Sequence, residues 1–236
     1  NLDNRALPGV KINIVMGRHA GYLTAASALA RVYPDDGPHL IYVPERAFHI
    51  EKFADDVKRV YAKYGRCVIA ASEGIVDKDG TAIAAAYTKE VDSHGNVQLS
   101  GSGALGDLLA NIVKQKTEIT RVRADTLGYL QRSFAGVCSE VDAKEARTVG
   151  ALAVRTAVTA NADGSIAIRR KPGRKYQVFF ERIPLSAVAK ETRHMPNEFI
   201  SAEGNDVTKA FIAYAAPIVG ELPKIGRFKG VKVAKK

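Results

Sequence analysis

Strand-like and helix-like segments alternate along most of this chain of 236 residues. Short, largely apolar runs at Lys11–Val15 and Cys67–Ala71 are typical of strands that are buried on both faces. Between them, Phe48–Tyr64 carries apolar residues at helical spacing. Because this alternation favours a largely parallel sheet covered by helices, we predict a Rossmann-like, three-layer α/β/α fold.

The other predicted elements continue the pattern. A polar, glycine-rich stretch at Thr81–Gly103, with Ser93–Asn96 as a turn, separates two of them. We expect strands at Leu40–Val43, Ile119–Leu127, Ile166–Arg169 and Gln177–Phe180, the last two forming a pair, and helices at Ala20–Val32, Leu105–Val113, Asp142–Ala160 and Asp206–Val219.

The composition is that of a folded protein without a membrane span. Hydrophobic residues make up 46% and charged residues 25% of the chain, and no apolar stretch approaches the ~18–20 residues that a membrane helix needs. Two cysteines are too few for a disulfide framework or a cysteine-based zinc site. The five histidines are scattered without ligand spacing, so we predict no metal site. With no signal-peptide pattern at the start, we expect a cytoplasmic protein.

Positive charge is concentrated in the last third of the chain. The segment Ile166–Lys236 has 15 Lys and Arg residues against 6 Asp and Glu, which accounts for +9 of the formal net charge of +10. A basic segment can bind nucleic acid, but this one has no RNA-binding motif, zinc finger or row of stacking aromatic residues. Nucleic-acid binding is therefore the weaker interpretation, and a solvated basic surface the stronger one.

An arginine beside a glycine lies where the first predicted strand ends. Met16, Gly17 and Arg18 follow that strand and precede a predicted helix. Ligands of open α/β sheets bind beyond the carboxyl ends of the strands. Glycine lets a ligand approach the backbone closely, and a helix N-terminus favours an anion. The turn is therefore a candidate phosphate site, and a plain surface arginine is the alternative.

Two further candidate groups also follow predicted strands. Glu73 comes just after the strand at Cys67–Ala71, where its carboxylate could accept hydrogen bonds from sugar hydroxyls or simply cap a turn. Arg123 lies in the fourth predicted strand, and Arg132 lies just past the turn that follows it. Two converging guanidinium groups suit a dianionic phosphate, because each presents a planar fork of donors. Taken singly, an arginine of this kind is more often a surface residue or an ion-pair partner.

Several segments of the chain, in their order, resemble the phosphofructokinase family. They are "VMGRHAGYLTAASALA", "YVPE", "VIAASEG", "RADTLGYLQRS" and "DAKEARTVGALAV". The segments "RHMPNEFISAEGNDVTKAF" and "DSHGNVQLSGSG" resemble its pyrophosphate-dependent branch. The resemblance implies part of the phosphofructokinase fold and the family's reaction, which moves a phosphoryl group onto the 1-hydroxyl of fructose 6-phosphate. It also implies a homo-oligomer that needs Mg²⁺ when complete.

The resemblance implies roles for the candidate residues at the strand ends. Met16, Gly17 and Arg18 match the family's sugar-phosphate turn, and Glu73 matches its acceptor for sugar hydroxyls. Glu45, in "YVPE", matches an effector-site residue of allosteric ATP-dependent enzymes, but a turn at a strand end is the favoured interpretation there.

Three residues further along the chain complete the implied sugar-phosphate contacts. Arg123 matches an arginine that often reaches the 6-phosphate from a neighbouring subunit. Tyr129 and Arg132 match the last contacts to the sugar phosphate. The ATP-dependent branch commonly has histidine where Tyr129 stands, so tyrosine at this position favours pyrophosphate as the phosphoryl donor.

The family's donor-site glycine loop and its Thr-Ile-Asp-Asn-Asp catalytic segment are absent from the sequence. The resemblance therefore implies that the general base, the donor lysine and the magnesium ligands lie outside this chain, and we assign no catalytic residue to it. Residues 1–136 would bind fructose 6-phosphate or fructose 1,6-bisphosphate, 137–197 would return to pack on the donor side, and 198–236 would form a C-terminal helix and basic tail. The alternatives are an ATP-dependent phosphofructokinase and a non-catalytic sugar-phosphate-binding module.

A narrow stripe of small apolar residues runs along the predicted helix Asp142–Ala160. If the donor half lies elsewhere, part of this stripe should lack a partner within the chain. It consists of Ala146, Val149, Gly150, Ala153, Val154 and Ala157.

Overall fold

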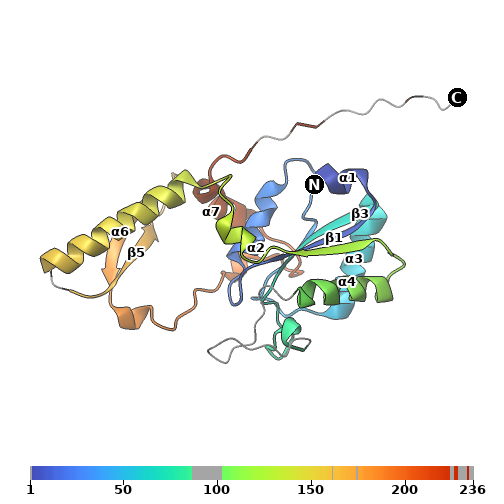
Figure 1. Cartoon of the computed structure of the whole chain (residues 1–236), viewed down its shortest axis with the longest axis horizontal. Helices are drawn as coiled ribbons and strands as arrows, with labels where there is room; N and C mark the ends of the chain where they lie inside the picture. The colour runs from blue at the N-terminus through green and yellow to red at the C-terminus, as the bar shows by residue number, and fades with distance from the viewer. Residues whose placement is uncertain are drawn as a thin grey trace.

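A four-stranded parallel sheet forms the centre of the computed structural model, which describes residues 2–86, 103–160, 162–173, 175–223, 226–227 and 233. The strand order is β2–β3–β1–β4, and Figure 1 labels its two central strands, β3 and β1. The first three predicted strands are confirmed with shifts of one or two residues, and the fourth begins later than predicted. The strands are β1 (Gly9–Val15), β2 (Leu40–Tyr42), β3 (Arg66–Ser72) and β4 (Val122–Thr126).

Two long helices cover one face of this sheet. They are α3 (Ile50–Tyr64) and α4 (Ala104–Lys116), close to the predicted positions. Their apolar stripes pack on Ile12 of β1, which is fully buried. Burying a side chain of this size stabilises the fold by about 1.5–3 kcal/mol, so this layer is the main hydrophobic core. Its largest buried helix side chains are Phe53, Val57, Leu109 and Val113.

The opposite face is covered by α2 (Tyr22–Ala26), the 3₁₀ helix η1 (Ser27–Ala30) and α7 (Lys209–Val219). Phe211 and Ala215 of α7 join a second buried cluster on this side. The helix predicted at Ala20–Val32 is thus shorter and tightens into 3₁₀ geometry. The Ser27 hydroxyl donates to Thr24 O at 2.5 Å, and such back-bonding competes with the α-helical pattern. Helices on both faces confirm the three-layer fold.

Five shorter helical elements connect these layers. They are α1 (Leu2–Ala6), η2 (Ile83–Ala86), α5 (Leu130–Ser133), η3 (Leu185–Ala187) and η4 (Asn197–Phe199). The turn predicted at Ser93–Asn96 lies outside the described residues.

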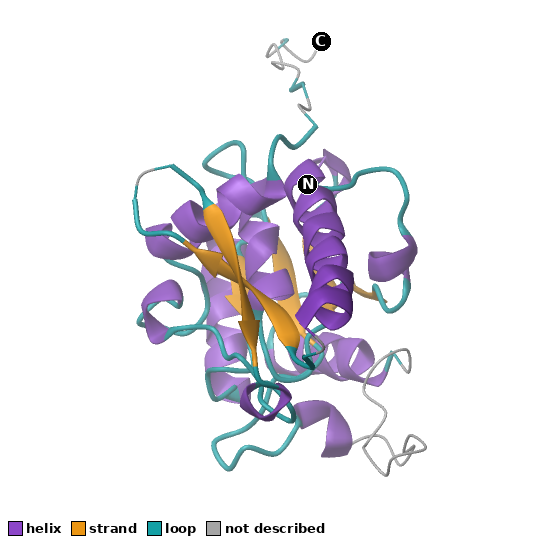
Figure 2. Ribbon diagram, turned by 90° about the vertical axis from the view of Figure 1, so that its left-hand side faces the viewer, coloured by secondary structure: helices purple, strands orange, loops and turns teal. Residues whose placement is uncertain are grey.

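A separate arm extends to one side of the sheet (Figure 1). It consists of α6 (Glu140–Ala160) and the antiparallel hairpin of β5 (Ser165–Arg170) and β6 (Val178–Ile183), which lies along the helix in Figure 2. The Tyr176 hydroxyl donates to Glu145 Oε1 at 2.8 Å and ties the hairpin to α6. Burial, followed by this contact, raises the pKa of Tyr176 to about 12. The predicted strand pair is confirmed.

The stripe of small apolar residues on α6 is left uncovered by the described part of the chain, as predicted. Val149 is half-buried, and the other five members are exposed. Val154, for example, retains 65% of its accessible surface. The buried side of α6 instead faces the hairpin through Glu145 and its neighbours. The arm therefore presents an unpaired apolar helix face.

One buried carboxylate joins the first layer to the loop before α7. Asp56 of α3 accepts hydrogen bonds from the Tyr42 hydroxyl at 3.0 Å and from Asn205 Nδ2 at 2.7 Å. Arg59, one turn along α3, donates to the other oxygen at 2.7 Å. Because Asp56 itself is 7% exposed, its contacts with Tyr42 and Asn205 are largely shielded from water, whereas the Arg59 side chain is mostly exposed.

Residues from both ends of the chain meet at two neighbouring acids, Asp35 and Asp36. Arg227 donates to Asp35 Oδ1 at 2.8 Å and to Asp36 Oδ1 at 2.9 Å. Arg66 donates to Asp35 at 3.0 Å, and Arg5 lies 3.8 Å from the same carboxylate. The hydrogen bonds from Arg227 and Arg66 hold the pKa of Asp35 well below its usual range. This acidic loop thus links distant parts of the sequence.

Candidate functional site

Three segments that leave the sheet at its carboxyl edge are joined to one another. Just after β3, Glu73 N donates to the oxygen of Val15, the last residue of β1, at 2.9 Å. Beyond β4, Leu127 N donates to Ile14 O at 3.0 Å. Because β1 lies between β3 and β4, the residues that follow it contact both neighbours. This edge is the place where parallel α/β sheets bind ligands.

The turn after β1 is held from two sides. Gly17 N donates to Glu73 Oε1 at 3.3 Å, and the Ser72 hydroxyl donates to Gly17 O at 2.5 Å. On the other side, Met16 N donates to Gln131 Oε1 at 2.9 Å. Glu73 is buried, with 6% of its surface exposed, and Ser72 is fully buried. Met16, Gly17 and Glu73 were all predicted as site residues, and the structure brings them together.

Two glycines allow this turn to form. Gly17 has φ 145°, a conformation that side chains rarely adopt. At Gly74, a Cβ atom would lie 1.8 Å from the backbone oxygen of Arg18. The segment after β3 therefore passes directly against the arginine turn, and glycine is required where the two backbones meet.

The exposed helix α5 and the residue before it carry the two side chains predicted after β4. Tyr129 is 71% exposed, and Arg132 is exposed as well. The Arg132 guanidinium carbon lies 5.9 Å from the centre of the Tyr129 ring, at the outer range of a cation–π contact. Because Gln131 contacts Met16, α5 lies beside the turn. Arg18, half-buried, belongs to the same turn. The arrangement gathers two guanidinium-bearing segments at one edge of the sheet.

Arg123 does not join this group. It is exposed on β4 and pairs in register with Lys11, which lies five residues before Met16. At about 3.3 Å per strand residue, this separation is roughly 16 Å along the sheet. Nearby, Lys11 forms an ion pair with Asp125. Arg123 therefore lies on an edge strand, away from the turn of its own chain.

Sequence reasoning missed Ser72 and Gln131. Both act on backbone groups of a turn that is remote in sequence, so no local pattern marks them. The signals in the sequence were weak: a polar residue at the end of a buried strand in one case, and a glutamine beside an arginine in the other.

Glu45 forms a junction at the end of β2. Its Oε1 atom accepts hydrogen bonds from Gly21 N at 3.0 Å and from Met195 N at 2.9 Å. These contacts fix the start of α2 and the approach to α7, which agrees with the favoured interpretation of a structural turn.

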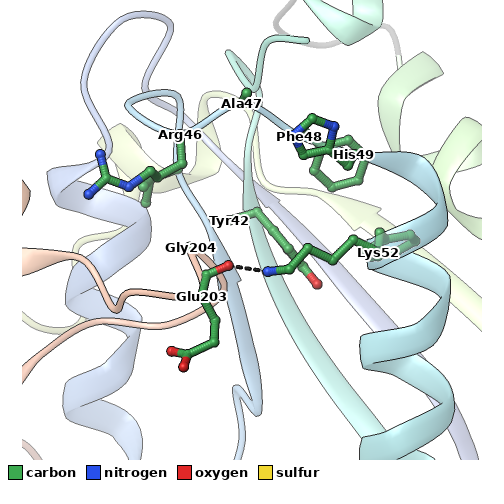
Figure 3. Close-up of a pocket in the computed structure, with 10 residues that line it drawn as sticks. Tyr42, Arg46, Ala47, Phe48, His49, Lys52, Glu203 and Gly204 are labelled. Carbon is green, nitrogen blue, oxygen red and sulfur yellow. Dashed lines mark hydrogen bonds between the residues drawn. The ribbon is translucent and has the colours of Figure 1, made fainter. Parts of the chain in front are cut away.

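A small cavity lies between β2, the first turn of α3 and the loop at 203–204 (Figure 3). Arg46 and Lys52 line it, but Arg46 donates to Asn197 Oδ1 at 2.7 Å and Lys52 donates to Glu203 O. These contacts hold the loop before α7 against α3. None of the seven predicted site residues lines this cavity.

Several cations of the basic C-terminal third are engaged within the chain. Arg169 pairs with Glu181 at 3.0 Å, and Arg170 donates to the Tyr214 carbonyl at 2.9 Å.

Among the described residues, no group of three or more His, Cys, Asp or Glu side chains could hold a metal ion. In the same part of the chain, no helix has both the length and the apolar character needed to cross a membrane.

Comparison with known proteins identifies the family. Residues 5–158 match the family model described as phosphofructokinase. The chain belongs to the phosphofructokinase family. The matched range contains the arginine turn, Glu73, α5 and most of α6, so every candidate site residue lies within the family region.

The curated relatives include pyrophosphate-dependent enzymes and one sulfofructose kinase. The chain is 54% identical over 238 residues to the pyrophosphate–fructose 6-phosphate 1-phosphotransferase of Rhodospirillum rubrum, and the match covers all of this chain and 58% of that protein. It is 37% identical to the enzyme of the same name from Xanthomonas campestris, with 94% of this chain and 54% of that protein covered. A sulfofructose kinase from Alkalicoccus urumqiensis is 30% identical over 81% of this chain and 48% of its own length.

Solved structures of the family share the fold. The pyrophosphate-dependent phosphofructokinase of Nitrosospira multiformis superposes with a TM-score of 0.77 at 27% identity, over 98% of this chain and 54% of that one. The enzyme of Marinobacter aquaeolei gives the same TM-score at 29% identity, over 100% and 57%. The chain therefore spans little more than half the length of these relatives.

Proposed function

We propose that this chain supplies the fructose 6-phosphate site of a pyrophosphate-dependent phosphofructokinase, which transfers a phosphoryl group from pyrophosphate to the 1-hydroxyl of the sugar. The observation that supports this most strongly is the clamped turn at Met16–Arg18. It lies at the carboxyl edge of the sheet against the buried Glu73 and beside Arg132 on α5.

Each predicted residue then has a definite task. Arg18 and Arg132 bind the 6-phosphate, because guanidinium groups form charge-assisted pairs with phosphate oxygens. One oxygen of Glu73 accepts a hydrogen bond from a sugar hydroxyl, while the other accepts the hydrogen bond from Gly17 N. Met16 and Gly17 present backbone to the sugar at close range. Tyr129 closes the site beside α5, where its ring lies near Arg132.

Arg123 has a different place in the proposal. It lies roughly 16 Å along the sheet from the turn of its own chain, at about 3.3 Å per residue. If it binds the 6-phosphate, it does so in a neighbouring copy. This assignment requires a homo-oligomer in which the β4 edges face the sites of partner chains.

The chemical step is assigned to the part of the enzyme outside this chain. Phosphoryl transfer is catalysed mainly by positioning and by neutralising charge on the transferred group. Among the described residues, no cluster of side chains fits Mg²⁺. We propose that the complete cytoplasmic enzyme takes its magnesium, its general base and its pyrophosphate site from the missing part.

The uncovered face of α6 is the proposed contact for that missing part. An exposed apolar surface of this kind marks an interaction site, and its small residues permit close approach of a second backbone layer. In this proposal residues 1–136 form the acceptor domain, 137–197 the segment that packs on the donor side, and 198–236 the C-terminal helix and tail.

Arg132→Ala in the complete enzyme should raise the KM for fructose 6-phosphate about ten-fold or more. The variant loses a charge-assisted contact worth about 1.5–3 kcal/mol, and about 1.4 kcal/mol corresponds to a factor of ten. Steady-state kinetics with pyrophosphate as donor measures this. Arg121→Ala, just before β4 at the opposite edge of the sheet, is the matched control and should leave the KM unchanged. Equal kinetics for Arg132→Ala and wild type would remove Arg132 from the site.

The choice of sugar needs its own measurement, because one relative is a sulfofructose kinase. Wild-type kinetics with fructose 6-phosphate and with sulfofructose should show a clear preference for the phosphate. A preference for sulfofructose would replace the proposed acceptor while keeping the site.

The 236-residue chain alone should form no detectable fructose 1,6-bisphosphate from pyrophosphate, Mg²⁺ and fructose 6-phosphate. Addition of a polypeptide that supplies the missing part of a relative should restore activity. A coupled assay of product formation on the rigorously purified chain measures this. Sustained, metal-dependent turnover by the chain alone would contradict the proposal that the general base and the pyrophosphate site lie outside it.

Two matched substitutions on α6 test whether its stripe makes the contact. Ala153 and Ala151 are both exposed, but only Ala153 belongs to the stripe. Ala153→Arg should prevent restoration, whereas Ala151→Arg should permit it. Equal restoration by both variants would show that the missing part docks elsewhere.

A further inference from the structure

The helix that carries Arg132 and follows Tyr129 is weakly anchored by its own packing. α5 has four residues, and none of them is buried. Leu130, within it, retains 71% of its accessible surface. The chain enters α5 through Gly128, whose φ of 49° lies in the left-handed region. Apolar burial therefore does not determine the position of this helix relative to the sheet.

The backbone hydrogen bonds of α5 are local. Leu130 N donates to Leu127 O at 3.1 Å, and Arg132 N donates to Tyr129 O at 2.9 Å. The Ser133 hydroxyl also donates to Tyr129 O, at 3.0 Å. These bonds maintain the turn of the helix, but they do not connect it across the carboxyl edge of the sheet.

Gln131 makes the contact that crosses this edge. Its Oε1 atom accepts the Met16 amide proton at 2.9 Å, over a sequence separation of 115 residues. Met16 is 8% exposed, so its amide has little access to water as a replacement partner. The side chain on α5 thus holds the backbone that begins the arginine turn.

We infer that Gln131 is a positioning residue, which aligns α5 with the Met16–Arg18 turn so that Arg132 and Arg18 face one bound phosphate. The inference rests on the proposed function of the turn. It predicts that Gln131 acts through the arginines and not by binding the sugar itself. Ser72 holds the turn from the β3 side, through Gly17 O, and the Gln131 amide holds it from the β4 side.

The hydrogen bond is tested first on the 236-residue chain, without any ligand. Gln131→Ala should reduce the hydrogen-exchange protection of the Met16 amide about two- to ten-fold, because one net hydrogen bond is lost. Gln131→Glu keeps an oxygen at the same reach and should retain the protection. Ser133→Ala removes a bond within α5 and serves as the control, with no change at Met16. Residue-resolved exchange by ¹⁵N NMR measures all three, and equal protection in Gln131→Ala and wild type would overturn the inference.

The consequence for binding is tested in the complete enzyme. Gln131→Ala should raise the KM for fructose 6-phosphate about two- to ten-fold and leave kcat within about two-fold. In an Arg132→Ala background the same change should add less than about two-fold, because the two residues then act as a unit. Additive effects would overturn the positioning role. If Arg132→Ala alone has no effect on KM, the proposed function fails instead, and the exchange result still decides the hydrogen bond.

Discussion

Replacing Asp56 with alanine is expected to lower the free energy of unfolding by about 3–4 kcal/mol. The substitution leaves the Tyr42 hydroxyl and the Asn205 amide without their acceptor in a buried region. Each unsatisfied buried group costs about 1–3 kcal/mol, and Arg59 loses its ion-pair partner as well. Urea denaturation followed by circular dichroism measures the change.

Asp55 provides a control on the same helix turn. Its side chain is 75% exposed and pairs with Lys58 at 3.3 Å. Exposed pairs of this kind contribute about 0.3–0.5 kcal/mol, so Asp55→Ala should have almost no effect. Similar losses in the two variants would show that the contacts of Asp56 do not stabilise the fold.

Acid should narrow the difference in stability between wild type and Asp56→Ala. Burial alone would raise the pKa of Asp56, but hydrogen bonds from Asn205, Arg59 and Tyr42 outweigh it and lower the pKa from its usual value. A carboxyl whose pKa is lower in the folded state stabilises the fold at neutral pH and loses this contribution as pH falls through the folded value. The stability gap should therefore be constant above about pH 5 and narrow below about pH 4.

Gly74→Ala is expected to destabilise the chain by about 3 kcal/mol and to disrupt the arginine turn. The new Cβ atom would lie 1.8 Å from Arg18 O and 2.4 Å from Arg18 C, both of them backbone atoms. Overpacking of this kind typically costs about 1–3 kcal/mol, and a rigid backbone neighbour places the cost at the upper end. Denaturant unfolding gives the stability, and the KM for fructose 6-phosphate in the complete enzyme should rise as well.

Gly150→Ala should instead raise the free energy of unfolding. Gly150 lies inside α6, and apart from its chain neighbours and the adjacent helix backbone no described atom would lie within 4 Å of its new Cβ. Alanine is favoured over glycine within a helix by about 0.5–1 kcal/mol. A stabilised Gly150→Ala beside a destabilised Gly74→Ala would show that steric contact at the turn is the cause. Two neutral variants would contradict the close approach of Gly74 to Arg18.

The layers of the fold could be predicted because their signals are local. β1 and β3 are short apolar runs, and α3 repeats Phe53, Val57 and Val60 at helical spacing before Gly65 ends it in the left-handed region. The helix after the arginine turn was predicted too long, because small residues favour a helix while Ser27 draws the backbone into a tighter one. Propensity describes such a segment on average and does not include one competing hydroxyl.

The candidate site could be predicted only in part. Met16, Gly17, Arg18 and Glu73 were found because each follows a recognisable strand and because their motifs resemble a known family. Their roles in binding remain predictions. The contacts that hold the turn were not foreseen, since Gln131 acts over 115 residues of sequence. A hydrogen bond between a side chain and a distant backbone amide produces no periodic pattern in the sequence.

The acidic loop has a practical consequence for preparing this protein. Arg227 lies close to the last residue of the sequence, and its guanidinium lies 4.0 Å from the centre of the Tyr33 ring and contacts both acids. Truncation before residue 227 would leave the buried Asp36 without that cation, whereas truncation just after it would keep the loop intact. The length of the tail in a sample therefore decides whether its measured melting temperature is comparable with that of the whole chain.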